Sequence, residues 1–107
     1  MISATVLKRN QQIYGFVISG HSGYENAGKD IVCAAVSVLA ENTINAIEAF
    51  TGDTVDVLVV DHREGFLNYR LRTVSEKSAL LLDTLVLGLN DISRSYSSFV
   101  KVSVEED

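Results

Sequence analysis

The chain has 107 residues, of which 47% are hydrophobic, so we expect a single domain over residues 1–107 with its own core. Its one cysteine excludes an intrachain disulfide, and no Cys/His cluster has metal-ligand spacing, so we expect no metal and no other cofactor. With 9 basic against 14 acidic residues, the net charge is −5. That balance argues against direct nucleic-acid binding and suits solubility or a basic polypeptide partner.

The sequence shows no basic segment followed by an apolar one at its start, as a signal peptide would have. It also shows no apolar run of the roughly 18 to 20 residues that would span a membrane. We therefore expect a protein of the cytoplasm, a reducing compartment, with no membrane contact.

The first half of the chain is predicted to form two strands, a helix and a third strand. The two strands cover residues 2–7 and 12–19 and are joined by a polar turn. A helix follows over residues 30–50, with Asp30 as its N-cap. Residues 54–61 are rich in β-branched side chains and indicate another strand.

The second half is predicted to repeat the order of strand, helix and strand. Residues 66–72 alternate between apolar and polar side chains, as does the closing run over residues 97–105. Between them a helix runs over residues 75–95, with Ser75 as a cap. Its core stripe has helical spacing and consists of Leu81, Leu82, Leu85, Leu89 and Ile92. The order β-β-α-β-β-α-β indicates an α+β fold in which two helices pack on a largely antiparallel sheet.

Both predicted helices carry more apolar surface than one sheet face requires. Residues 31–40 are nearly apolar all round, and Leu80, Val86 and Leu87 lie outside the core stripe of the second helix. A helix that is apolar on every side must be covered on every side. We therefore predict a homodimer in which a second copy covers part of this surface.

His21 and Cys33 flank a loop that contains glycines, which raises the question of a nucleophile and its base. With Asp30 as N-cap, Cys33 falls in the first helical turn, where unpaired amides and the helix dipole stabilise a thiolate. His21 would take the thiol proton if the loop folded back, and first-turn amides, including that of Cys33, would be donors to an oxyanion. A lone cysteine between valine and alanine is, however, more often a packing residue. The residues alone leave both interpretations open.

The stretch GHSGYENAGKDIVCAAVS, residues 20–37, resembles the signature of the ribosomal-processing cysteine proteases, the Prp family. That signature is Gly-His-x-Gly-Tyr, a short loop, and then Gly-x-Asp-Ile-Val-Cys-Ala-Ala-x-Ser. The resemblance implies a cytoplasmic bacterial homodimer that removes the N-terminal extension of a large-subunit ribosomal protein, the one numbered twenty-seven. It also implies that Cys33 is the nucleophile and His21 its general base.

Three further residues, Gly20, Asp30 and Ser37, match positions that the family pattern counts as functionally important. Each also has a structural interpretation. Gly20 would permit a positive φ where a strand ends, and Asp30 would cap the helix. Ser37 lies four residues after Cys33 and hence on the same helix face. We expect these three residues to support the site rather than to carry its chemistry.

Residues 22–29 are predicted to form a loop that closes over the substrate, because small residues let such a lid move. The candidate substrate-contacting residues within it are Ser22, Gly23, Tyr24 and Gly28. The group that orients His21 stays open among Glu25, Asp56 and Asp61. We expect His62 to be solvated and not to act as the base.

Two other classes of function stay open beside the protease. The chain would be a non-catalytic ribosome-assembly or adaptor dimer if its cysteine were buried and inert. Alternatively, Cys33 would serve as a redox or acyl-carrying thiol, although the absence of a second cysteine argues against a dithiol cycle. The motif favours the protease over both.

Overall fold

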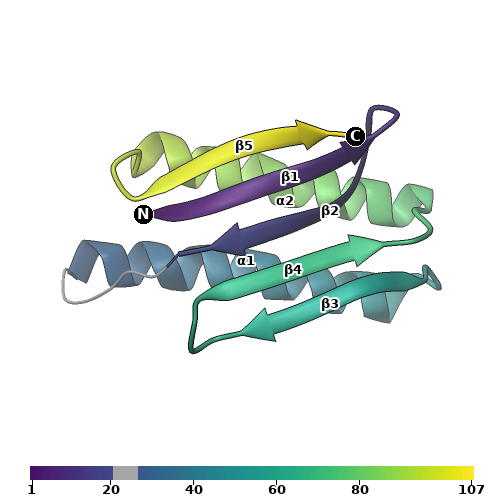
Figure 1. The fold of residues 1–107 in the computed structure, drawn as a ribbon, viewed down its shortest axis with the longest axis horizontal. Coiled ribbons are helices and arrows are strands. Elements are labelled where there is room, and N and C mark those ends of the chain that lie inside the picture. The colour runs from purple at the N-terminus through teal and green to yellow at the C-terminus, as the bar shows by residue number, and fades with distance from the viewer. Residues whose placement is uncertain (21–26) are drawn as a thin grey trace.

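The structure is a computed structural model that describes residues 1–20 and 27–107. Its elements follow the predicted order and form one five-stranded sheet whose spatial order is β3-β4-β2-β1-β5. Both helices lie on the same face of this sheet (Figure 1). Neighbouring strands are antiparallel except β1 and β5, which are parallel. The elements are β1 (Ile2–Arg9), β2 (Gln12–Ser19), α1 (Ala27–Phe50), β3 (Val55–Asp61), β4 (Phe66–Leu71), α2 (Glu76–Ser95) and β5 (Val100–Glu106).

The turn between β1 and β2 is tighter than the four-residue turn expected from the sequence. Only Asn10 and Gln11 connect the strands, with φ of 53° and 66°. Positive φ at both central residues is the geometry that matches the twist of a two-residue hairpin. The first strand therefore extends to Arg9 rather than ending at residue 7.

The prediction that Asp30 caps the first helix is wrong, because α1 begins at Ala27. Asp30 is the fourth residue of the helix, and Cys33 is the seventh. An acidic residue is favourable both at the N-cap and within the first turn, where it faces the positive end of the helix dipole. Gly28 also argued against a helix at this point, since glycine is disfavoured in a helix interior by about 1 kcal/mol. These local preferences left the true start of α1 undetermined.

The core lies between the sheet and the two helices. From α1 it takes a stripe with helical spacing, Val32, Val36, Ala40, Ile44 and Ile47. From α2 it takes Leu82, Leu85 and Leu89, which confirms the predicted stripe, while Leu81 and Ile92 pack at its edge. The helices approach closely at Gly88, where a Cβ would come within 2.9 Å of the Leu39 Cδ1 atom.

One helix within the described residues, Ile31–Phe50 of α1, is long and apolar enough by composition to cross a membrane. This differs from the sequence-based expectation that no segment is. The same segment supplies the five core residues of α1, and the core helix of a soluble domain passes the same test. Its core stripe packs against the sheet, whereas Ile31 and Val38, outside that stripe, are 63% and 67% exposed.

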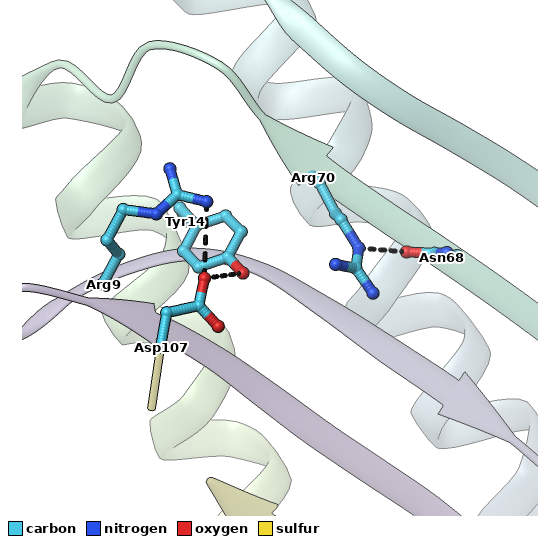
Figure 2. Close-up of polar contacts among 5 residues, drawn as sticks. All are labelled: Arg9, Tyr14, Asn68, Arg70 and Asp107. Carbon is cyan, nitrogen blue, oxygen red and sulfur yellow. Dashed lines mark hydrogen bonds and ion pairs between the residues drawn. The ribbon is translucent and has the colours of Figure 1, made fainter. Parts of the chain in front are cut away.

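A polar cluster joins the β1–β2 hairpin to the residue that follows β5. The Tyr14 hydroxyl donates a hydrogen bond to Asp107 Oδ2 over 2.8 Å, and an Arg9 guanidinium nitrogen lies 3.4 Å from the same oxygen (Figure 2). The Arg9 guanidinium also stacks 4.2 Å from the centroid of the Tyr14 ring. Burial, together with the hydrogen bond to Asp107, raises the pKa of Tyr14. These contacts hold the end of β5, which pairs only with β1, against the hairpin.

A second polar cluster fixes the start of α2. Asp53, in the connection between α1 and β3, accepts hydrogen bonds from the Ser75 amide at 2.9 Å and the Ser75 hydroxyl at 2.7 Å. It also accepts one from the hydroxyl of Ser78, which is fully buried. Ser75 is the N-cap of α2, as predicted. Burial by itself would raise the pKa of Asp53, but the hydrogen bonds from Ser75 and Ser78 outweigh it and lower the pKa to about 2.

We expect Asp53→Asn to lower the free energy of unfolding by about 1–3 kcal/mol at pH 7, because buried hydroxyls lose a charged acceptor. The folded pKa of about 2 lies below the ordinary value of 3.8. The stabilisation is therefore complete above about pH 4 and is lost as the pH falls toward 2. Urea unfolding at pH 7 and at pH 2.5 should show the difference between wild type and Asp53→Asn shrinking at low pH. Asp83→Asn, at an exposed carboxylate of α2, is the control, and an equal loss at both pH values would contradict the assignment.

Candidate active site

A cavity of about 280 Å³ opens between α1 and one end of the sheet. Its wall on α1 is formed by Cys33, Val36, Ser37, Ala40 and Glu41. Its other walls are formed by residues at the start of β1, the end of β2, the end of β3 and the start of β4, together with the turn that joins β3 to β4: Ile2, Ile18, Gly20, Val60, Asp61, His62, Gly65, Phe66 and Leu67. Most of this lining is apolar, and the polar groups are few.

Cys33 lies at this cavity and is partly exposed. Its side chain packs against the edge of the core, so it is neither a fully buried packing residue nor a freely solvated thiol. Ser37 shares the same helix face and also lines the cavity, as the spacing of four residues predicts. In the part of the chain that the structure describes, the Ser37 hydroxyl makes no hydrogen bond. It is therefore available to a molecule in the cavity.

The expected role of the helix N-terminus at Cys33 is wrong in its geometry. Only the first four amides of a helix lack an intrahelical partner, and in α1, which begins at Ala27, all of them precede Asp30. Cys33 lies almost one turn further along, where its amide is within the hydrogen-bonded part of the helix. The amide of Cys33 is thus not one of the free donors that the sequence suggested for an oxyanion.

Gly20 has the positive φ expected from the sequence, at 119°. A Cβ at this position would lie 2.3 Å from the Met1 carbonyl oxygen, so the backbone of β2 approaches the start of β1 too closely for a side chain. The Gly20 amide donates to the Gly65 carbonyl at 3.0 Å. Glycine is required here because the ends of two strands and a turn converge at this wall of the cavity.

The structure separates two of the three acidic residues considered as partners of His21. Asp61 lines the cavity, and its Oδ1 atom accepts hydrogen bonds of 3.0 Å from the amides of Arg63 and Glu64. Asp56 does not line the cavity and pairs instead with Arg72 over 3.1 Å. Glu25 lies outside the described residues.

Four of the predicted site residues, His21, Ser22, Gly23 and Tyr24, also lie outside the described residues. Gly28 belongs to α1, so the predicted loop over residues 22–29 is wrong at its end. Asp30 likewise belongs to the helix and not to a cap position. The structure thus brings Gly20, Cys33 and Ser37 together at one cavity.

A contact between Glu41 and His62 was not predicted from the sequence. The His62 Nε2 atom lies 3.3 Å and 3.4 Å from the two carboxylate oxygens of Glu41, and both residues line the cavity. Glu41 follows Ser37 by four residues, as Ser37 follows Cys33, so helical spacing would have placed it on the same face. Its partner on the β3–β4 turn carries no such signal. The expectation that His62 is merely solvated therefore omitted its only recorded polar contact among the described residues.

The chemistry available at this cavity is that of a thiol beside an apolar surface. Among the described residues, no group of three or more His, Cys, Asp or Glu side chains is arranged to hold a metal ion. A partly exposed cysteine next to a hydroxyl, with a carboxylate–imidazole pair at a distance, suits nucleophilic attack on a bound ligand.

Comparison with known structures supports the same fold. The protein SMU.848 from Streptococcus mutans superposes with a TM-score of 0.88 at 31% identity, covering 100% of this chain and 96% of that one. A Prp protease from Staphylococcus aureus, solved with a substrate peptide, superposes with a TM-score of 0.89 at 23% identity, covering 98% and 100%. The architecture is therefore conserved over the whole length of these proteins.

Comparison with characterised sequences identifies the family. The ribosomal processing cysteine protease Prp of Bacillus subtilis is 25% identical over 109 aligned positions, covering 96% of both chains. The protein of the same name from Staphylococcus aureus is 26% identical over 87 residues, covering 81% of this chain and 82% of the relative. The family model described as cysteine protease Prp matches residues 1–101. The chain therefore belongs to the Prp family and is a cysteine protease.

Proposed function

We propose that this protease uses Cys33 as its nucleophile and His21 as its general base. The observation that carries the proposal is the position of Cys33. A cysteine protease needs a thiolate, this chain contains a single cysteine, and that cysteine lines the cavity between α1 and the sheet. The adaptor alternative required a buried, inert thiol, whereas Cys33 is partly exposed.

Two histidines compete for the role of base, since the sequence contains only His21 and His62. His62 lines the cavity but already contacts Glu41 at the end of the α1 wall remote from Cys33. Support for His21 comes from the family motif and from its chain neighbour Gly20, which lines the cavity.

The proposed reaction is a two-step acyl transfer. The Cys33 thiolate attacks the carbonyl carbon of the peptide bond and forms a C–S bond, and the C–N bond breaks as the His21 imidazolium protonates the departing amine. Water then attacks the thioester, His21 takes its proton, and the thiolate is restored. Ser37 and Asp30 support the site, Ser37 through a hydroxyl on the same helix face as the thiol.

The proposed substrate is the N-terminal extension of a large-subunit ribosomal protein. Relatives are named ribosomal processing proteases, and the Staphylococcus aureus enzyme has been solved with a substrate peptide and with a covalently linked product peptide. A ribosomal protein is basic, so the net charge of −5 favours association by long-range attraction. The proposal places the reaction in the cytoplasm, where ribosomal proteins are made.

We expect Cys33→Ala to reduce cleavage of the extended ribosomal protein by about 1,000-fold or more, because no other thiol can form the acyl-enzyme. His21→Ala should cause a comparable loss, whereas His62→Ala should retain measurable turnover. Intact-mass spectrometry of the substrate after incubation with each variant measures this directly. Residual turnover by a folded Cys33→Ala protein at near the wild-type rate would remove Cys33 from the role of nucleophile. A loss with His62→Ala as deep as that with His21→Ala would contradict the assignment of the base.

The proposal also includes a homodimer. Four large apolar side chains on the helical layer, Ile31, Val38, Leu80 and Leu87, are between 63% and 67% exposed. They are the outward-facing residues that the apolar character of the helices led us to expect. A second copy that buried them would remove this apolar surface from water.

We expect the wild type to sediment as a dimer at micromolar concentration. Leu87→Glu should raise the dissociation constant of that dimer by about 30-fold or more, since a charge would be buried in an apolar contact. Ser103→Glu, which adds the same charge at an exposed position on β5, is the control. A monomeric wild type, or equal effects of the two substitutions, would contradict this interface.

A further inference from the structure

Positions within the cavity can be described along the axis of α1. Cys33 and Glu41 are eight residues apart on one helix face and both line the cavity. At a rise of 1.5 Å per residue, this separation is about 12 Å along the helix. The thiol therefore lies at one end of the α1 wall, and the contact between Glu41 and His62 lies toward the other.

The space between these two ends is apolar. The side chains of Val36 and Ala40 face it from α1, and those of Ile18, Val60 and Leu67 face it from the sheet. A cavity of about 150 Å³ with an apolar lining binds benzene, so a cavity of about 280 Å³ has room for one large apolar side chain. A charged side chain in the apolar part of this space would lose its hydration without gaining a partner until it reached Asp61, Glu41 or His62.

The contact between Glu41 and His62 bridges the two walls of the cavity. Glu41 belongs to α1, and His62 belongs to the turn between β3 and β4. That turn is held in place by the Asp61 side chain, which accepts from two turn amides, and by the hydrogen bond from Gly20 to Gly65. His62 therefore projects from a turn whose backbone makes these three hydrogen bonds, and the pair spans the gap between helix and turn.

The exposure of the pair shows that stability is not its main contribution. The side chains of His62 and Glu41 are 74% and 39% exposed, and such surface pairs contribute little to the free energy of folding. Removing either partner should leave the core intact, since neither belongs to it. What the removal changes is the wall of the cavity.

We propose that the Glu41–His62 contact is the distal wall of a substrate side-chain pocket and limits the length of the apolar side chain that the protease accepts near the cleaved bond. The proposal rests on the assignment of Cys33 as nucleophile, because the length of the pocket is measured from the thiol to the Glu41–His62 contact. A side chain that fits between thiol and wall positions the peptide bond for attack. A longer one collides with the pair or must break its contact.

The test uses peptides that span the cleaved junction. Glycine replacements along the peptide first identify the peptide residue whose loss lowers the wild-type kcat/KM most. That residue is then varied among leucine, phenylalanine, 2-naphthylalanine and lysine. The enzymes are wild type, Glu41→Ala, His62→Ala and the double variant. Asp91→Ala, which removes an exposed ion pair with Arg94 on α2 outside the cavity, is the matched control. Thermal unfolding of every variant checks that it is folded.

We expect each single variant to raise the ratio of kcat/KM for the naphthylalanine peptide to that for the phenylalanine peptide by about tenfold or more, the scale of size discrimination in an apolar pocket. The change should lie mainly in KM, and the double variant should match the singles because either loss opens the same wall. Asp91→Ala should leave the ratio as in wild type. A ratio that stays within threefold of wild type in both single variants would overturn the proposal. So would a wild-type preference for the lysine peptide that disappears in Glu41→Ala, since Glu41 would then be a cation-binding group.

Peptide affinity measured by calorimetry on the Cys33→Ala background separates this proposal from the one it rests on. If Cys33→Ala cleaves like wild type, Cys33 is not the nucleophile. The proposal that the Glu41–His62 contact limits the side chain beside the cleaved bond is then contradicted as well. Cys33→Ala could instead be inactive while the naphthylalanine-to-phenylalanine affinity ratio is unchanged by Glu41→Ala and His62→Ala. In that case Cys33 remains the nucleophile, and only the proposal about the Glu41–His62 contact is overturned. A rise in that affinity ratio parallel to the kinetic one supports the wall.

Discussion

The packing of one face of α1 on the sheet is the constraint from which the site follows. Val32, Val36 and Ala40 are buried in that contact, and each of them is followed directly by a residue of the cavity wall: Cys33, Ser37 and Glu41. Successive residues of a helix are rotated by about 100°. Burying the first stripe therefore turns the second toward the edge of the sheet. Core packing and site geometry are two consequences of the same helical period.

The opposite side of the cavity depends on a close backbone approach that only glycine permits. Gly20 brings the end of β2 against Met1 and donates to Gly65, so the ends of β1 and β2 and the β3–β4 turn meet at one place. Asp61 shapes that turn through two amide hydrogen bonds. The turn then presents His62 across the cavity from α1. A local steric requirement at Gly20, directly after β2, is thus connected to the wall that we propose for substrate selection.

The comparisons show how little of the sequence this architecture needs. At 31% identity the Streptococcus mutans protein retains the fold over its whole length, because apolar side chains of similar size can exchange within a core at small cost. The residues that we propose for the chemistry have no such freedom, since a thiol nucleophile and an imidazole base cannot be replaced by side chains of similar shape. The stretch over residues 20–37 was therefore the most informative part of the chain.

The sequence by itself determined what depends on near neighbours. The order of the elements, Ser75 as N-cap, the core stripe of α2, the positive φ of Gly20 and the shared face of Cys33 and Ser37 were all predicted and are confirmed. Each follows from periodicity, capping or steric rules that act within a few residues. The predicted start of α1 is wrong because Gly28 and Asp30 are compatible with more than one local structure.

Only the tertiary structure decided what joins distant parts of the chain. The parallel pairing of β1 with β5, the bonds from Ser75 and Ser78 to Asp53, and the contact of Glu41 with His62 link residues that are 20 or more positions apart. No local pattern encodes such pairs, because each forms only when the whole core has condensed and set the distance between its elements. The sequence determined that a cysteine lies on a core helix. The fold determined that the ends of the strands and the β3–β4 turn form the opposite wall of its cavity.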